Sequence, residues 1–191
     1  MTSAGTGGLV TDLTALRESA GTHLGYTDWE EMTQERVNQF AAATGDYQFI
    51  HIDVERARQT PFGGTIAHGY LTLSLMAPVM QRLLNITDAA MGLNYGLDRV
   101  RFPAPLPVGA QWRGCAEIAD VKDIPGGLQV KVRGTSRSRA SRSRPAWPSA
   151  WSASTGERRP AQTVELNWPE PGQVVAVDVR RAEEERGFGY F

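Results

Sequence analysis

Two acid–base residues, Asp46 and His51, stand five positions apart in the first half of the chain. A carboxylate is ionised at neutral pH, and an imidazole gains or loses its proton near pH ~6.5. Side chains of these two types on one ordered loop can converge on a single water molecule, remove a proton from it and return a proton to carbon. The pair therefore predicts a site that activates water.

A second motif, Ala67-His68-Gly69, opens an apolar segment that continues to Leu84. The first N–H groups of a helix have no partner within the helix, and they carry the positive end of its dipole. Donors of this kind can polarise a carbonyl group and stabilise the negative charge that forms on its oxygen. We therefore expect the start of this helix to belong to the same site.

Capping and turn residues in the sequence predict the helices and loops around these two motifs. Thr33 is a favourable N-cap, and Gly45 can adopt the left-handed conformation that ends helices, so a helix is expected between them. The following segment, 45–67, lacks regular periodicity and is interpreted as a long ordered loop, with one helical turn around Asp53–Arg58 that Asp53 caps. An earlier short helix is expected from Leu9 to about Ala20.

Residues 68–84 are apolar on almost every side, which is typical of a helix in the middle of a domain. Pro78 lies inside this segment, so a kink or break is expected near Ala77. Strand-like segments follow it, separated by Pro- and Gly-rich turns, at 93–97, 100–102, 111–121 and 128–132. The order predicts an α+β fold in which an antiparallel sheet wraps around one central helix.

The composition excludes several classes of function. A net charge of −1 over 191 residues gives no indication of a nucleic-acid partner. Cys115 is the only cysteine, so neither an internal disulfide nor a cysteine-based metal site is expected, and Cys115 is interpreted as a small buried residue. We also expect no signal peptide and no membrane span, which makes a cytoplasmic location the default.

Two blocks of the sequence resemble the MaoC-like, hydratase-2 family. The family signature runs approximately Gly-Asp-x-Asn-Pro-Ile/Leu-His-x-Asp and then Phe-x-x-x-Ile-Ala-His-Gly-Met. In this chain Gly45-Asp46 and His51-x-Asp53 match the first block, and Phe62-x-x-x-Ile66-Ala67-His68-Gly69 matches the second. Asn94-Tyr95-Gly96 and the segment 100–109 are also similar to family members, so the resemblance covers about residues 27–133.

The resemblance implies a hot-dog fold and a homodimer that hydrates trans-2-enoyl-CoA to (R)-3-hydroxyacyl-CoA without a cofactor or metal. By position, Asp46 and His51 are the catalytic pair, and the N–H of Gly69 binds the thioester carbonyl. Five residues in or beside the two blocks are expected to bind the acyl-CoA substrate: Gln48, Phe62, Gly64, His68 and Tyr70. His68 is also expected to hold the loop through hydrogen bonds. Two alternative hypotheses about function remain open: a hot-dog acyl-CoA thioesterase, and a non-catalytic acyl-CoA-binding or partner subunit.

The sequence departs from the family in three ways, one of which is the absence of the serine often found in the central helix near Ala77. Gln48-Phe49 replaces the family's Asn-Pro, and the long apolar strand that normally ends the domain is replaced from Gly134 by a Ser/Arg run that is too polar to predict a strand. We therefore divide the chain into a flexible N-terminus (1–8), a hot-dog domain (9–133) and an atypical C-terminal segment (134–191), partly disordered. One hypothesis is that this last segment is translated in a shifted reading frame, which resequencing the gene would decide.

Overall fold

The computed structural model describes residues 7–139, together with the backbone of two further strands at 162–166 and 174–178. Sequence expectations for the rest of the C-terminal segment lie outside the described residues. In chain order the elements are β1 (Leu9–Thr11), α1 (Leu13–Leu16), β2 (His23–Tyr26), β3 (Glu30–Glu31), α2 (Gln34–Thr44), α3 (Phe49–Ile52), α4 (Val54–Arg58), α5 (Gly69–Ser74), α6 (Met76–Leu83), β4 (Leu84–Ile86), β5 (Met91–Asn94), β6 (Leu97–Arg101), β7 (Gln111–Ile124), β8 (Gly127–Arg139), β9 (Gln162–Leu166) and β10 (Val174–Asp178).

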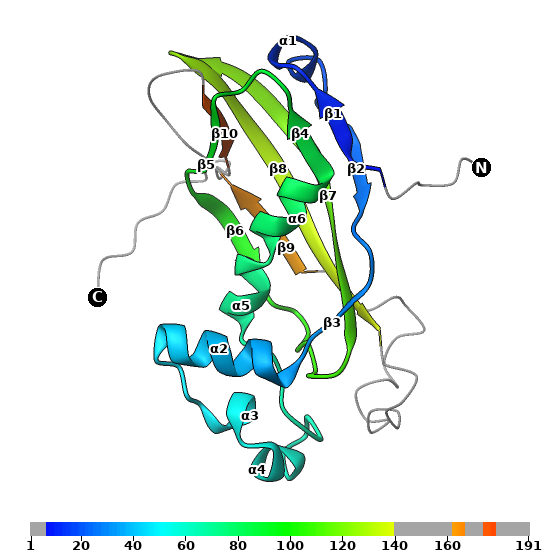
Figure 1. Ribbon diagram of the computed structural model, residues 1–191, viewed down its shortest axis with the longest axis vertical. Coiled ribbons are helices and arrows are strands. Elements are labelled where there is room, and N and C mark those ends of the chain that lie inside the picture. Colours follow the sequence, from blue (N-terminus) through cyan, green and yellow to red (C-terminus); the bar gives the residue numbers. More distant parts are fainter. Residues whose placement is uncertain (1–6, 140–161, 167–173, 179–191) are drawn as a thin grey trace, which may run out of the picture.

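A sheet built around two long strands dominates the molecule. Strands β7 and β8 form an antiparallel hairpin, whose turn contains Gly126 with a positive φ of 82°. The main strand order is β2-β7-β8-β10-β5, while β3 pairs with β7 and β9 pairs with both β6 and β8. Strand β10 is parallel to its two neighbours, so the sheet is mostly antiparallel. Figure 1 shows α6 lying across one face of this sheet, which confirms the expected α+β arrangement.

The central helix is present, but it is divided into α5 and α6 at Leu75. Pro78 has no N–H, and its ring clashes with the carbonyl of the residue four positions earlier, which is Ser74. The interruption therefore falls at the end of that preceding turn, two residues before the position near Ala77 that the sequence predicts. No helix among the described residues is long and apolar enough to cross a membrane.

Close packing of α6 on the sheet forms the core. Val79 of α6 is 1% exposed, and it lies directly over Gly114 of β7, where a β-carbon would come within 2.4 Å of its Cγ2. Along β8 the side chains of Leu128, Val130 and Val132 alternate with more exposed residues, and all three are buried in this core. Cys115 is also buried, as expected.

The N-terminal expectation is wrong in part. Residues 9–11 form strand β1, which pairs in parallel with β4, and only Leu13–Leu16 are helical. Asp12 caps this short helix by accepting a hydrogen bond from the backbone N–H of Ala15 at 2.7 Å. Pairing with β4, which is more than 70 residues away, overrides the local apolar spacing that favoured a longer helix.

The expectation that the Ser/Arg run forms no strand is wrong for residues 134–139, because β8 continues to Arg139. Small residues of the run face inward, as the burial of Ser136 shows, while the arginines face outward. The guanidinium groups of Arg137 and Arg139 lie over the rings of Tyr26 and Trp29, at 5.4 and 4.2 Å from the ring centroids. Ladder pairing with β7 and these cation–π contacts replace the apolar side chains that the sequence lacks.

Candidate active site

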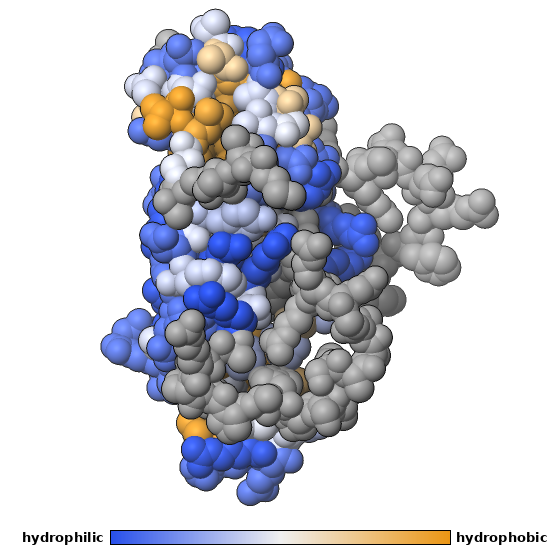
Figure 2. Space-filling view, turned by 90° about the vertical axis from the view of Figure 1, so that its right-hand side faces the viewer, coloured by the Kyte–Doolittle hydropathy of each residue, from blue (hydrophilic) through white to orange (hydrophobic). Residues whose placement is uncertain are grey.

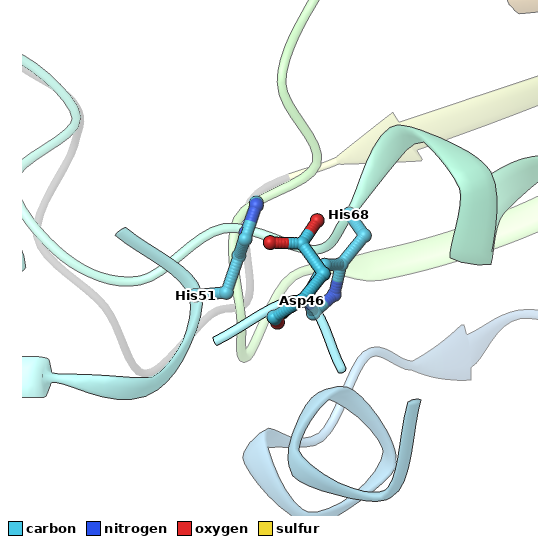
Figure 3. A group of neighbouring side chains, drawn as sticks. All are labelled: Asp46, His51 and His68. Atoms are coloured by element: carbon cyan, nitrogen blue, oxygen red, sulfur yellow. The ribbon is translucent and has the colours of Figure 1, made fainter. Parts of the chain in front are cut away.

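Three side chains from two separate segments of the sequence meet at one end of the molecule. The ligand atoms of Asp46, His51 and His68 all lie within 4.8 Å of one another. Figure 3 shows the carboxylate of Asp46 reaching toward the two imidazole rings, which enter from separate segments of the chain. We call these three residues the polar cluster. The structure therefore brings together the two residues predicted to be the catalytic pair and adds His68 to them.

Asp46 owes its position to the end of helix α2. Thr33 caps the start of α2 by accepting from the N–H of Arg36 at 3.2 Å, and Gly45 ends it with a φ of 76°. Both ends are those predicted from the sequence. The chain turns sharply at Gly45, and Asp46 follows as an exposed residue whose Oδ1 accepts from the backbone N–H of Gln48 at 3.3 Å.

His51 lies in the short helix α3, which the sequence did not predict, and it is only 6% exposed. Its Nδ1 lies 2.8 Å from the carbonyl oxygen of Ile66. A carbonyl only accepts, so Nδ1 carries the proton and Nε2 keeps a free lone pair in the neutral ring. Burial lowers the pKa of His51, His68 lowers it further, and the bond to Ile66 and the charge of Asp46 oppose the shift. His51 is consequently a neutral base at physiological pH.

His68 is more deeply buried, with 2% of its surface exposed. Its Nε2 lies 3.0 Å from the carbonyl oxygen of Asp46, so this nitrogen donates, and the hydrogen bond ties the loop to the start of α5. The ring stacks on that of His51 at a centroid distance of 3.8 Å, and Phe40 of α2 lies 5.0 Å away. The Nδ1 atom is buried without a hydrogen-bond partner among the described residues. The loop-holding hydrogen bond expected of His68 is thus present.

A side-chain clamp that the sequence did not reveal fixes the backbone around His51. Gln34 of α2 donates from Nε2 to the carbonyl oxygen of His51 at 2.7 Å and accepts at Oε1 from the hydroxyl of Thr65 at 2.6 Å. Thr65 is 2% exposed. One amide therefore joins helix α2, helix α3 and the segment that leads to His68. A glutamine in the first turn of a helix gives no sequence signal for such a role.

Gly69 is the first residue of α5, directly after His68. A β-carbon at this position would lie 2.9 Å from the ring of Phe102, so the close approach of that ring requires a glycine. Phe102 in turn meets Tyr70 edge to face, with a centroid distance of 6.2 Å. The start of α5 is therefore adjacent to the polar cluster along the chain and is covered on one side by aromatic rings.

The remaining predicted substrate residues differ in their exposure. Gln48 is exposed, Phe62 is half-buried and Gly64 is buried, while Tyr70 is 69% exposed. Gln48 contacts the cluster through its backbone, by the bond to Asp46. A cavity of about 240 Å³ opens elsewhere, along α6, β4 and β5, and none of its lining residues belongs to the polar cluster. Asp53 caps α4 by accepting from the N–H of Arg56 at 3.0 Å, as predicted.

The arrangement suits chemistry on a bound water. Asp46 supplies an exposed negative carboxylate, and His51 supplies a neutral imidazole with a free lone pair. Both are acceptors, and the two can hold and deprotonate a water molecule that lies between them. The neighbouring N-terminal turn of α5 provides N–H groups that can bind an electron-rich oxygen.

Residues 16–139 match the MaoC like domain family, and the chain belongs to that family. One curated relative is the 3-hydroxyacyl-thioester dehydratase Z of Mycobacterium tuberculosis (strain CDC 1551 / Oshkosh). The two are 46% identical over 127 residues, which cover 66% of this chain and 82% of the relative. The resemblance seen in the two sequence blocks is thereby confirmed.

Solved structures show the same fold at low sequence identity. An R-hydratase from Pseudomonas aeruginosa in its unliganded form is 16% identical, with a TM-score of 0.55, and the match covers 90% of this chain and 92% of that one. An (R)-hydratase from A. caviae is 17% identical, with a TM-score of 0.55, and the match covers 78% of this chain and 96% of that one. The hot-dog fold expected from the sequence is confirmed.

Proposed function

We propose that this protein is a hydro-lyase that adds water to a trans-2-enoyl thioester and produces an (R)-3-hydroxyacyl thioester. The observation that carries the proposal is the meeting of Asp46 and His51, two acceptors suited to one water, in a single cluster. Membership of the MaoC like domain family supports it, and so does the name of the mycobacterial relative, a 3-hydroxyacyl-thioester dehydratase. The same site would catalyse the reverse dehydration.

In the proposed mechanism, Asp46 and His51 hold the water and accept one of its protons as its oxygen bonds to C3 of the substrate. The π electrons of the C2–C3 double bond move toward the thioester carbonyl, whose oxygen becomes negatively charged. The N–H of Gly69 stabilises this oxygen. The proton taken from water is then delivered to C2, and the carbonyl re-forms. One water is consumed, and no electrons are exchanged with any carrier.

The substrate side of the proposal extends beyond the cluster. We propose that a coenzyme A thioester is the substrate, that no cofactor is needed, and that Gln48, Phe62, Gly64 and Tyr70 contact the substrate. We also propose a homodimer. Two solved structures with this fold are (R)-hydratases, and another is a complex of two different chains from Mycobacterium tuberculosis.

The test measures hydration of trans-2-enoyl-CoA substrates of several chain lengths by loss of enoyl absorbance, with release of free thiol followed in parallel. Asp46→Ala and His51→Ala should each lower kcat by about 10²- to 10⁴-fold, the range of general acid–base catalysis. Asp53→Asn and His23→Gln are matched controls, because Asn still caps α4 and His23 is an exposed residue outside the cluster.

The outcomes separate the competing functions. Full hydration in both cluster variants would disprove the mechanism. Thiol release without hydration would identify a thioesterase, and tight binding of acyl-CoA with neither reaction would identify a binding subunit.

A further inference from the structure

We propose that the polar cluster is also a binding site for one divalent transition-metal ion, with Zn²⁺, Ni²⁺ and Co²⁺ as the ions it suits. Its ligands are the carboxylate of Asp46, Nε2 of His51 and Nδ1 of His68. The proposal goes beyond the hydration described above and does not require it. Only one consequence of metal binding, inhibition, rests on the proposed function.

The hydrogen bonds of the two histidines determine which nitrogens are free. His51 donates from Nδ1 to the carbonyl of Ile66, and His68 donates from Nε2 to the carbonyl of Asp46. The opposite nitrogen of each neutral ring therefore holds a lone pair. Metal-binding histidines in proteins characteristically donate their second N–H to a carbonyl or carboxylate in this way, because that bond fixes the tautomer and orients the ring.

The buried Nδ1 of His68 is the second observation that points to a ligand. It has no hydrogen-bond partner among the described residues, although only 2% of the surface of His68 is exposed. Burying a polar atom without a partner costs free energy. A water that donates to both Asp46 and His51 has no proton left for a third acceptor, whereas a cation satisfies three lone pairs together. The three acceptors therefore fit a cation better than a single water.

The distances allow coordination after a modest rearrangement. One carboxylate oxygen of Asp46 and one ring nitrogen of each histidine lie within 4.8 Å of one another, whereas ligands at about 2.0–2.1 Å from a tetrahedral Zn²⁺ are separated by about 3.3 Å. Asp46 is exposed, and its carboxylate is held only by the long 3.3 Å bond from the N–H of Gln48, so it can move toward the histidines, which are held by the carbonyls and by each other. A fourth position would remain for water.

The donor types define the class of metal. Imidazole nitrogen is a good ligand for Zn²⁺, Ni²⁺, Co²⁺ and Cu²⁺, while Mg²⁺ and Ca²⁺ prefer sites built from oxygen. An ion bound to Asp46 and His51 would occupy both lone pairs that the proposed hydration needs. Metal binding and hydration should therefore exclude each other.

Binding is tested on the purified full-length chain by isothermal titration with Zn²⁺ and by the visible absorption of bound Co²⁺. The expected result is one equivalent of metal per chain and a Co²⁺ spectrum typical of a low-coordinate nitrogen–oxygen site, with no such binding of Mg²⁺. Asp46→Asn, His51→Gln and His68→Gln should each weaken Zn²⁺ binding by at least about tenfold. His23→Gln is the matched control and should bind like the wild type, since His23 is the one histidine of the chain that lies outside the cluster.

Circular dichroism of each variant establishes that it is folded, and Asp46→Asn keeps the test decisive if a buried histidine variant does not fold. The proposal is overturned if Zn²⁺ does not bind at one equivalent, or if binding survives Asp46→Asn or is lost in His23→Gln. Inhibition of enoyl-CoA hydration by Zn²⁺ and its reversal by a chelator are measured separately. If the protein binds metal but has no hydratase activity, the proposed function is refuted and the proposed metal site is still supported.

Discussion

At the scale of single residues, the candidate site is defined by which nitrogen of each histidine carries a proton. The carbonyl of Ile66 fixes the tautomer of His51, and the carbonyl of Asp46 fixes that of His68. Both assignments depend on backbone atoms rather than on other acidic side chains. Stacking of the two rings places a second imidazole beside His51 without a hydrogen bond between them.

The pKa of His51 leads to a prediction about the pH dependence of activity. Burial lowers this pKa from its ordinary value of about 6.5, so the neutral ring persists into mildly acidic solution. Under the proposed function, kcat/KM should be constant at neutral pH and should fall only when the pH drops below about 6.5. A pH–rate profile of enoyl-CoA hydration measures this, and an acid limb centred above pH ~7 would contradict the assignment of His51.

The same shift predicts how stability depends on pH. The pKa of His51 is lower in the folded state than in the unfolded chain, so the unfolded chain takes up this proton first as the pH falls. The contribution is therefore fully present above about pH 6.5 and is lost progressively below it. Urea unfolding between pH 5 and pH ~8 should show a smaller loss of stability in His51→Gln than in the wild type. Equal losses would argue against a depressed pKa.

At the scale of elements, three short segments are held together by one amide and one turn. Gln34 links α2 to the backbone of His51 and to Thr65, and Gly45 ends α2 immediately before Asp46. Figure 1 shows α2, α3 and α4 grouped at one end of the molecule, below the sheet and next to α5. The site is therefore assembled where several helix ends meet.

The clamp predicts a loss of catalytic rate together with a loss of stability, because the hydroxyl of buried Thr65 would lose its partner. Gln34→Ala removes both hydrogen bonds, and because small displacements of a catalytic group are costly, kcat should fall by about tenfold to a hundredfold. Gln39→Ala is the matched control, since Gln39 lies on the same helix, is exposed and hydrogen-bonds to the side chain of exposed Glu35. Kinetics and urea unfolding of both variants are compared. A Gln34→Ala enzyme with unchanged kcat would show that the clamp is dispensable.

The end of α2 gives a prediction about backbone conformation. Gly45 has a φ of 76°, and no atom beyond its chain neighbours lies within 4 Å of the place where a β-carbon would stand. Gly45→Ala should therefore cost about 1–2 kcal/mol through backbone strain alone. Gly45→Asn should cost less, because Asn tolerates the left-handed region. Urea unfolding measures both, and equal costs for Ala and Asn would contradict the explanation.

At the scale of the whole molecule, the position of α6 on the sheet determines how the central helix is placed. Gly114 lets β7 approach Val79 more closely than any side chain would permit. Figure 2 shows a largely hydrophilic surface on one face, with most of its hydrophobic surface toward one end and a smaller hydrophobic spot toward the other. Within the described residues, the buried apolar side chains form one core cluster to which α6, β7 and β8 all contribute.

This contact predicts a large effect from a single methyl group. In Gly114→Ala the added carbon would lie 2.4 Å from Cγ2 of Val79, so the helix or the strand must move. The expected cost is about 1–3 kcal/mol, the usual range for overpacking. Gly7→Ala is the control, because no atom lies within 4 Å of its new carbon. Thermal unfolding of the two variants tests this, and Val79→Ala combined with Gly114→Ala should recover part of the loss.

Features that depend on neighbouring residues were predictable from the sequence. Thr33 and Gly45 predicted both ends of α2, and Asp53 predicted the cap of α4. The two motifs predicted the family and the proximity of Asp46 and His51. Helix caps and turns are stabilised within a few residues of chain, so their signals are local.

Features that depend on distant partners became visible only in the three-dimensional structure. The clamp of Gln34, the hydrogen bond that leaves Nδ1 of His68 free and the extension of β8 to Arg139 all require atoms at least 17 residues away. The strand identity of residues 9–11 was also settled by pairing with β4. Asp46 and His51 were therefore predictable as a pair, but the three-residue cluster that surrounds the proposed water and metal site depends on long-range packing that no local pattern encodes.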